Sequence, residues 1–107
     1  MRIPKLLFLL LLTLSCRTEE KLPIPEDRLV PLLANIHEAE ALINEQTDAY
    51  AKDSLTDQYY DYLFELHQVE EAEFEATMAI LQDDMPRLER LYIKVLEELA
   101  LREAELK

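Results

Sequence analysis

The sequence contains no glycine and no tryptophan, and it has only one cysteine in 107 residues. Without glycine, phosphate-binding loops and most two-residue β-hairpins are costly, because they need a positive φ or a close backbone approach. Nucleotide enzymes are therefore poor candidates. Positive charge is also scarce, since 11 Lys and Arg stand against 23 Asp and Glu, a formal net charge of -12. A polyanion cannot gain affinity by releasing counterions from phosphates, so nucleic acid is excluded as a partner.

The first sixteen residues have the pattern of a bacterial export signal. Arg2 and Lys5 precede an apolar run over residues 6–14, which is too short to span a bilayer. The only cysteine, Cys16, follows this run after one small residue, an arrangement that resembles the lipobox of bacterial lipoproteins. We predict a signal peptide over residues 1–15 and a lipid anchor on Cys16. The alternative is a free thiol beside an ordinary cleavage site.

Residues 16–24 are predicted to be the lipidated cysteine and a short tether. Cleavage before Cys16 would remove two basic residues and no acidic ones, which makes the mature chain even more acidic. The stretch Cys16–Glu20 is similar to the acidic export signal of some Bacteroidota surface lipoproteins, and an ordinary solvated tether is the alternative. We expect a lipid-anchored protein of the bacterial cell envelope, on the outer membrane. The sequence leaves open whether it faces the periplasm or the cell surface.

Apolar residues recur three and four positions apart through residues 25–107, which predicts one helical domain. A first helix begins after Pro25 and ends near Gln46. Pro31 either lies in the first turn of a helix that begins near Arg28 or kinks a longer one. The predicted buried stripe of this helix consists of Leu29, Leu32, Leu33, Ile36, Ala39 and Ile43.

Three further helices are predicted. Asp53 or Ser54 is expected to cap the second helix, the third runs from about Glu70 to Gln82, and Pro86 opens the fourth. The predicted apolar faces are Leu55, Tyr59, Tyr62, Leu63, Leu66 and Val69 in the second helix, Phe74, Met78 and Leu81 in the third, and Leu88, Leu91, Tyr92, Val95, Leu99 and Leu106 in the fourth. No window alternates with the period of a strand. The predicted fold is an all-α bundle of three to four helices.

Residues 25–27 with 36–41 resemble the opening of a family of small Bacteroidota lipoproteins, the domain-of-unknown-function family 4296. Residues 88–99 resemble its closing segment. The family commonly has Gly and Ser in the turn before the third helix, where this chain has residues 68–70. The family has no assigned activity, so the resemblance implies an envelope location and a helical domain but no mechanism.

His37 and Glu40 are the candidate polar residues on the apolar face of the first helix. A buried carboxylate needs a partner, so we expect His37, a tyrosine hydroxyl or Arg102 to reach Glu40. Carboxylate-bridged metal bundles use Glu and His three residues apart, but in the opposite order and on two helices. We therefore predict a structural hydrogen bond, with no catalytic residue, no metal site and no cofactor.

Tyr60, Phe64 and His67 form a second stripe on the second helix, roughly opposite its predicted core face. Two apolar faces indicate either a central helix packed on both sides or a face kept for a partner. We favour central packing and retain these three residues as a possible partner-binding site.

Two functions remain open from the sequence. The favoured one is a lipid-anchored helical binding or scaffold module with an envelope protein as partner, which is not an enzyme. The alternative is a small metal-dependent or acid/base enzyme that uses His37 and Glu40.

Overall fold

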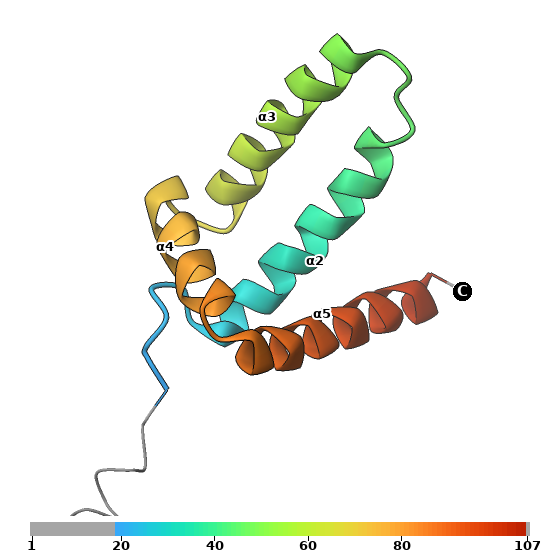
Figure 1. Cartoon of the computed structure of the whole chain (residues 1–107). Coiled ribbons are helices and arrows are strands. Elements are labelled where there is room, and N and C mark those ends of the chain that lie inside the picture. Colours follow the sequence, from blue (N-terminus) through green and yellow to red (C-terminus); the bar gives the residue numbers. More distant parts are fainter. Residues whose placement is uncertain (1–18, 107) are drawn as a thin grey trace, which may run out of the picture.

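The computed structural model describes residues 19–106, and the predicted signal peptide and Cys16 lie outside this range. Within it the chain forms four helices and no strand (Figure 1). The helices are α2 (Glu26–Ile43), α3 (Ala49–Leu66), α4 (Glu71–Gln82) and α5 (Met85–Glu105). The predicted all-α bundle is confirmed. None of these four helices is long and apolar enough to cross a membrane.

Helix α2 contributes more buried residues to the core than any other helix. Glu26 and Asp27 lie in its first turn, where the helix dipole favours negative charge. Pro31 lies inside the helix, so the longer of the two predicted helices is the one that forms. The predicted stripe is confirmed in full, because all six of its residues are buried. Such a stripe lies along one side of a helix, and the burial of that side packs the helix against its neighbours.

Helix α3 begins earlier than predicted. The carboxylate of Asp48 accepts a hydrogen bond from the backbone N–H of Tyr50 and caps the helix, so the expected cap at Asp53 or Ser54 is wrong. Asp48 satisfies an end of the helix that would otherwise leave backbone donors unpaired. The observed start and the predicted start each offer a residue that can cap a helix. The start at Asp48 makes the helix longer by at least one turn.

The turn between α3 and α4 contains Gln68 with φ 54, the only positive φ among the described residues. This left-handed conformation costs most residues about 1–2 kcal/mol and costs glycine little. Helix α4 then begins with a capping box between Glu70 and Glu73, close to the predicted start.

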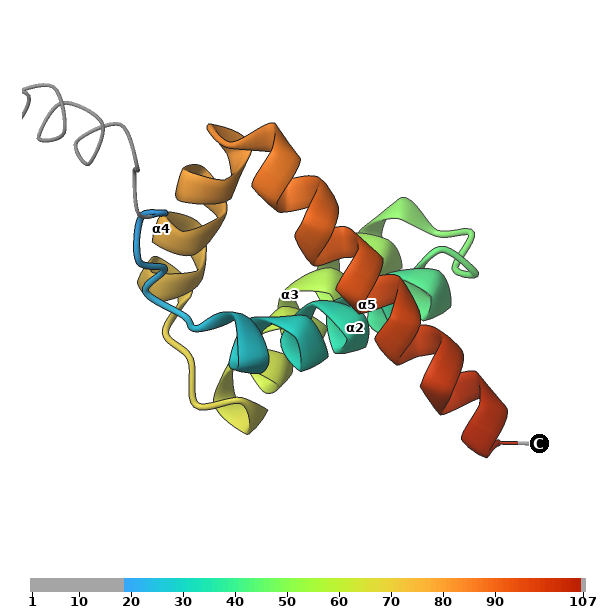
Figure 2. The same cartoon turned by 90° about the horizontal axis from the view of Figure 1, so that it is seen from below.

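Helix α5 begins as predicted, with Pro86 in its first turn and the Asp84 carboxylate accepting from the backbone N–H of Arg87. Leu91 and Val95 are buried. Tyr92, however, is 44% exposed and Leu106 is 88% exposed, so their assignment to the core is wrong. The end of α5 extends beyond its neighbours, as Figures 1 and 2 show.

Helix α2 packs against both α3 and α5, and α4 packs against α5. Figure 1 shows α2 lying between α3 and α5. The central helix is therefore α2, whereas the sequence had favoured α3 for this position. Helix α2 takes the central position because its apolar stripe is the longer one. Seven of its residues are buried, compared with two residues of α3.

Residues 19–24 are part of the domain, which corrects the prediction that they form a tether. Leu22 and Ile24 are buried in the core, and the N–H of Ile24 donates to Oγ1 of the buried Thr77 at 3.1 Å. We call residues 19–24 the docked segment. The domain therefore begins well before residue 25, and only two residues separate Cys16 from Glu19.

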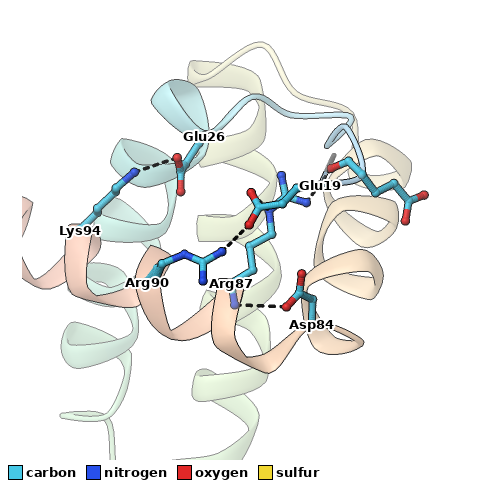
Figure 3. Close-up of polar contacts among 7 residues, drawn as sticks. Glu19, Glu26, Asp84, Arg87, Arg90 and Lys94 are labelled. Atoms are coloured by element: carbon cyan, nitrogen blue, oxygen red, sulfur yellow. Dashed lines mark hydrogen bonds and ion pairs between the residues drawn. The ribbon is translucent and has the colours of Figure 1, made fainter. Parts of the chain in front are cut away.

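Ion pairs hold the outer end of the docked segment on α5 (Figure 3). Arg90 pairs with the Glu19 carboxylate, and Arg87 donates to the backbone carbonyl of Glu20 at 2.6 Å. Beside them Lys94 pairs with Glu26 of α2 at 2.8 Å. These contacts are exposed, so each contributes little, while the buried side chains supply most of the docking energy.

Candidate functional site

A surface cavity of about 390 Å³ lies where all four helices meet, and we call it the four-helix cavity. Sites for small ligands span roughly 300–1,000 Å³. Its wall is mostly apolar, with exposed polar side chains among the lining residues. The cavity is lined by Leu33, Ile36, His37, Glu40, Tyr60, Phe74, Glu75, Met78, Ala79, Gln82, Tyr92 and Val95.

The cavity reflects how α4 is placed. Helix α4 packs mainly against α5 rather than along α2, and the cavity is lined by residues of both α2 and α4. Leu33 and Ile36 of α2 and Val95 of α5 are buried and contribute to the apolar part of the wall.

A carboxylate–phenol pair lies at the wall of the cavity. The hydroxyl of Tyr60 on α3 donates to Oε1 of Glu40 on α2 at 2.9 Å. Burial of the phenol, the hydrogen bond to Glu40 and its negative charge raise the pKa of Tyr60 to about 12. The phenol therefore stays protonated at neutral pH and orients the carboxylate, whose other lone pairs can accept from a ligand.

His37 and Glu40 are exposed, which corrects the prediction that they are buried. The partner of Glu40 is one of the three expected groups, a tyrosine hydroxyl. Arg102 instead reaches Asn35 and Glu38. Both residues line the four-helix cavity, which is open to solvent beside this part of α2.

The stripe of Tyr60, Phe64 and His67 does not form one exposed face. Phe64 is buried and packs against Tyr60, with ring centroids 5.8 Å apart, and against Phe74 at 5.1 Å. Phe64 is therefore a core residue, and of these three residues only Tyr60 lines the four-helix cavity. Tyr62 and Leu66 of α3, which the sequence had assigned to the core, are exposed.

His67 belongs to a polar network that joins three helices. Arg102 of α5 donates to Oδ1 of Asn35 on α2, which leaves the Asn35 amide nitrogen to face Nε2 of His67 at 2.7 Å. Nε2 must then accept, so the imidazole is neutral. Burial, Arg102 and Arg28 all lower the pKa of His67.

Carboxylates surround the four-helix cavity. A second hollow of about 290 Å³ lies beside it between α3 and α4 and is lined by Asp57, Asp61, Glu71 and Glu75 together with four other residues. A third, of about 310 Å³, includes Glu40 and Tyr60. No Lys or Arg lines any of the three hollows. This surface therefore carries a concentrated negative charge beside apolar side chains.

Phe74 and Met78, which the sequence placed on the apolar face of the third helix, are half-buried, pack against the core and also line the cavity. Tyr92, which the sequence placed on the apolar face of the fourth helix, is exposed at the cavity. Sequence reasoning did not select Glu75 at all. Glu71 and Glu75 lie one helical turn apart beside the predicted face of Phe74 and Met78, and this juxtaposition was the available signal.

Within residues 19–106, no group of three or more His, Cys, Asp or Glu side chains is placed to hold a metal ion. The features described above define a small all-α domain with an apolar, acid-rimmed cavity between its helices.

The family model described as a domain of unknown function (DUF4296) matches residues 21–105, so the chain belongs to this family. The family resemblance inferred from the sequence is thereby confirmed. No curated protein and no solved structure matches the chain significantly. The match begins at Lys21, within the docked segment.

Proposed function

We propose that this protein is a binding module of the bacterial cell envelope, anchored to the outer membrane by lipid on Cys16. The observation that carries the binding function is the four-helix cavity, a hollow of about 390 Å³ whose apolar wall is open to solvent. Exposed apolar surface beside oriented polar groups is typical of interaction sites. Tyr60 and Glu40 supply such a group, because their hydrogen bond fixes the direction of the carboxylate.

An acid/base enzyme that uses His37 and Glu40 is the weaker candidate. The observed hydrogen-bond partner of Glu40 is the hydroxyl of Tyr60, at 2.9 Å, and not the imidazole of His37. The pair is suited to hold a ligand in place, and we propose binding rather than catalysis.

The docked segment supports a close position of the domain to the membrane. Glu19 is held on α5 by Arg90, and three residue steps from Glu19 to Cys16 span at most about 10–11 Å. Two or more acyl chains on Cys16 would bind the bilayer stably, since each buried methylene contributes about 0.8 kcal/mol. The anchored domain would then lie directly at the membrane surface.

Cys16→Ala is expected to abolish anchoring. The full-length variant should accumulate in the soluble fraction or remain as a precursor of higher mass, because the lipobox cannot then be diacylated and cleaved. Fractionation of cells and intact mass spectrometry measure this. Thr18→Ala is the matched control and should stay with the membranes. Unchanged fractionation and mass for Cys16→Ala would exclude the lipoprotein assignment.

Photocrosslinking tests the cavity as a binding site. A photoreactive phenylalanine analogue in place of Tyr92, at the cavity, should form a discrete adduct in intact cells, whereas the same analogue in place of Tyr50 should not. Tyr50 is 82% exposed and lies outside the cavity, so it controls for random encounters. Equal adducts from both positions, or none from Tyr92, would contradict the proposed site.

A further inference from the structure

A further hollow adjoins the four-helix cavity on the surface of α5. This α5 hollow, of about 430 Å³, is lined by Met85, Leu88, Glu89, Tyr92, Ile93 and Leu96. Tyr92 lines both hollows, so they lie next to each other at this side chain. Met85, Ile93 and Leu96 are each more than half exposed. We call the two adjoining hollows, with Tyr92 between them, the groove.

The groove is elongated. The residues of α5 that line it run from Met85 to Leu96, about 16 Å along the helix axis. Met85, Tyr92 and Leu96 follow one another at spacings of seven and four residues, on one face of the helix. A stripe of this shape matches the apolar stripe of an amphipathic helix, which is read through anchors at positions i, i+3, i+4 and i+7.

The charges at the groove select a cationic occupant. Glu40, Glu75 and Glu89 line it, and Asp57, Asp61 and Glu71 lie in the adjoining hollow of α3 and α4. Each of these carboxylates would attract a basic side chain of the occupant and would repel an acidic one.

A second copy of this chain does not match these charges. The basic residues of α5 already pair with acidic groups of the same molecule: Arg90 with Glu19, Lys94 with Glu26, and Arg102 with Glu38 and Glu98. A second copy would therefore bring mainly carboxylates to a surface that is already acidic. The net charge of -12 makes this repulsion general.

We propose that the groove binds a cationic amphipathic helix of another protein, with its apolar residues in the four-helix cavity and the α5 hollow. The proposal rests on the binding function proposed above and names its partner class. Lysine or arginine side chains on both flanks of that helix meet the carboxylates of α2, α4 and α5. Exposed ion pairs of this kind contribute specificity and a salt-dependent association rate more than affinity.

The test uses the full-length lipoprotein in nanodiscs of zwitterionic lipid, with empty nanodiscs as the blank. Two fluorescent probes, a leucine–lysine peptide and a leucine–glutamate peptide of about four helical turns, carry the same leucine spacing. Fluorescence anisotropy should show saturable binding of the leucine–lysine peptide. The leucine–glutamate peptide should bind at least about tenfold more weakly.

Paired variants locate the binding site. Glu71→Lys combined with Glu75→Lys should weaken binding of the leucine–lysine peptide about tenfold, because two attractive charges become repulsive. The control combines Glu65→Lys with Glu103→Lys, which changes the net charge equally at exposed positions that line none of the hollows. It should change the affinity less than about threefold.

Leu96→Ala tests the apolar contact, and Leu101→Ala is its control on the same helix. Both side chains are exposed, at 58% and 63%, so neither change should affect folding. Weaker binding of the leucine–lysine peptide is expected for Leu96→Ala alone. Circular dichroism of each variant confirms that the helices are retained.

Three results would overturn the proposal: equal binding of the two peptides, equal loss in the paired charge variants, or displacement of the peptide by dodecylamine at the same molar concentration. The last result would assign the groove to a small cationic amphiphile. Crosslinks from position 92 are independent of these peptides. If they persist while the peptides fail, the binding function stands and the partner class is wrong.

Discussion

Ile24→Ala is expected to lower the free energy of unfolding by about 2–4 kcal/mol, because it leaves a cavity in the core. Ile24 is 1% exposed although it precedes the first helix of the domain, and its backbone N–H is bonded to Thr77. Domains are stable by only about 5–15 kcal/mol, so a large part of the stability depends on a segment that looks like a linker in the sequence. Urea denaturation followed by circular dichroism measures this loss.

Ile93→Ala is the matched control, since it makes the same substitution at a side chain that is 56% exposed. It should change the free energy of unfolding by less than about 0.5 kcal/mol. Thr77→Val tests the hydrogen bond separately and should cost about 1–3 kcal/mol, because the buried N–H of Ile24 loses its acceptor. Equal effects of Ile24→Ala and Ile93→Ala would show that residues 19–24 are a loose tether.

Asn35→Ala is expected to cost about 1–3 kcal/mol by removing the residue that joins Arg102 to His67. The same network makes stability depend on pH. The pKa of His67 is lowered in the folded protein, so below about pH 6.5 the unfolded chain binds the proton more readily. The contribution of neutral His67 to the free energy of unfolding is therefore complete above about pH 6.5. It is lost as the pH falls toward the pKa that His67 has in the folded protein.

Denaturation at about pH 7.5 and about pH 5.5 measures this dependence. His67→Gln should remove most of the change between the two values, whereas His37→Gln, at the exposed histidine of α2, should leave it intact. Asn35→Asp should reverse the sign, because a carboxylate accepts from a protonated imidazole and favours it. A pH dependence that is unaffected by His67→Gln would contradict the neutral, accepting role of His67.

Local sequence features determined the helices and the core face of α2. The three- and four-residue spacing from Leu29 to Ile43 predicted the buried stripe correctly, because apolar residues with this spacing over the whole helix lie on one side of it. The starts of α4 and α5 were also predicted closely. Glu70 and Pro86 act on the backbone within one turn, so no distant residue is needed to interpret them.

The orientation of α3 could not be determined locally. Its sequence offers two apolar faces, one through Tyr62 and Leu66 and another through Tyr60 and Phe64. Only the packing of α2 and α4 decided that Phe64 is buried and Leu66 exposed. Glu40 was misplaced for a related reason, since its position on the apolar stripe is buried only where another helix covers it, and the four-helix cavity is open there.

The sequence by itself determined an acidic, glycine-free, helical chain with one long buried stripe. Helix formation and the position of such a stripe depend on residues within one or two turns of each other, so they can be predicted from the sequence. The tertiary structure decided the docked segment and the groove. Leu22 and Ile24 alternate with Pro23 and Pro25 in a short segment before the first helix, so their burial depends on distant residues such as Thr77, which is hydrogen-bonded to the backbone of Ile24. The groove likewise depends on how the four helices meet, because their packing leaves apolar side chains of α5 and of the four-helix cavity uncovered.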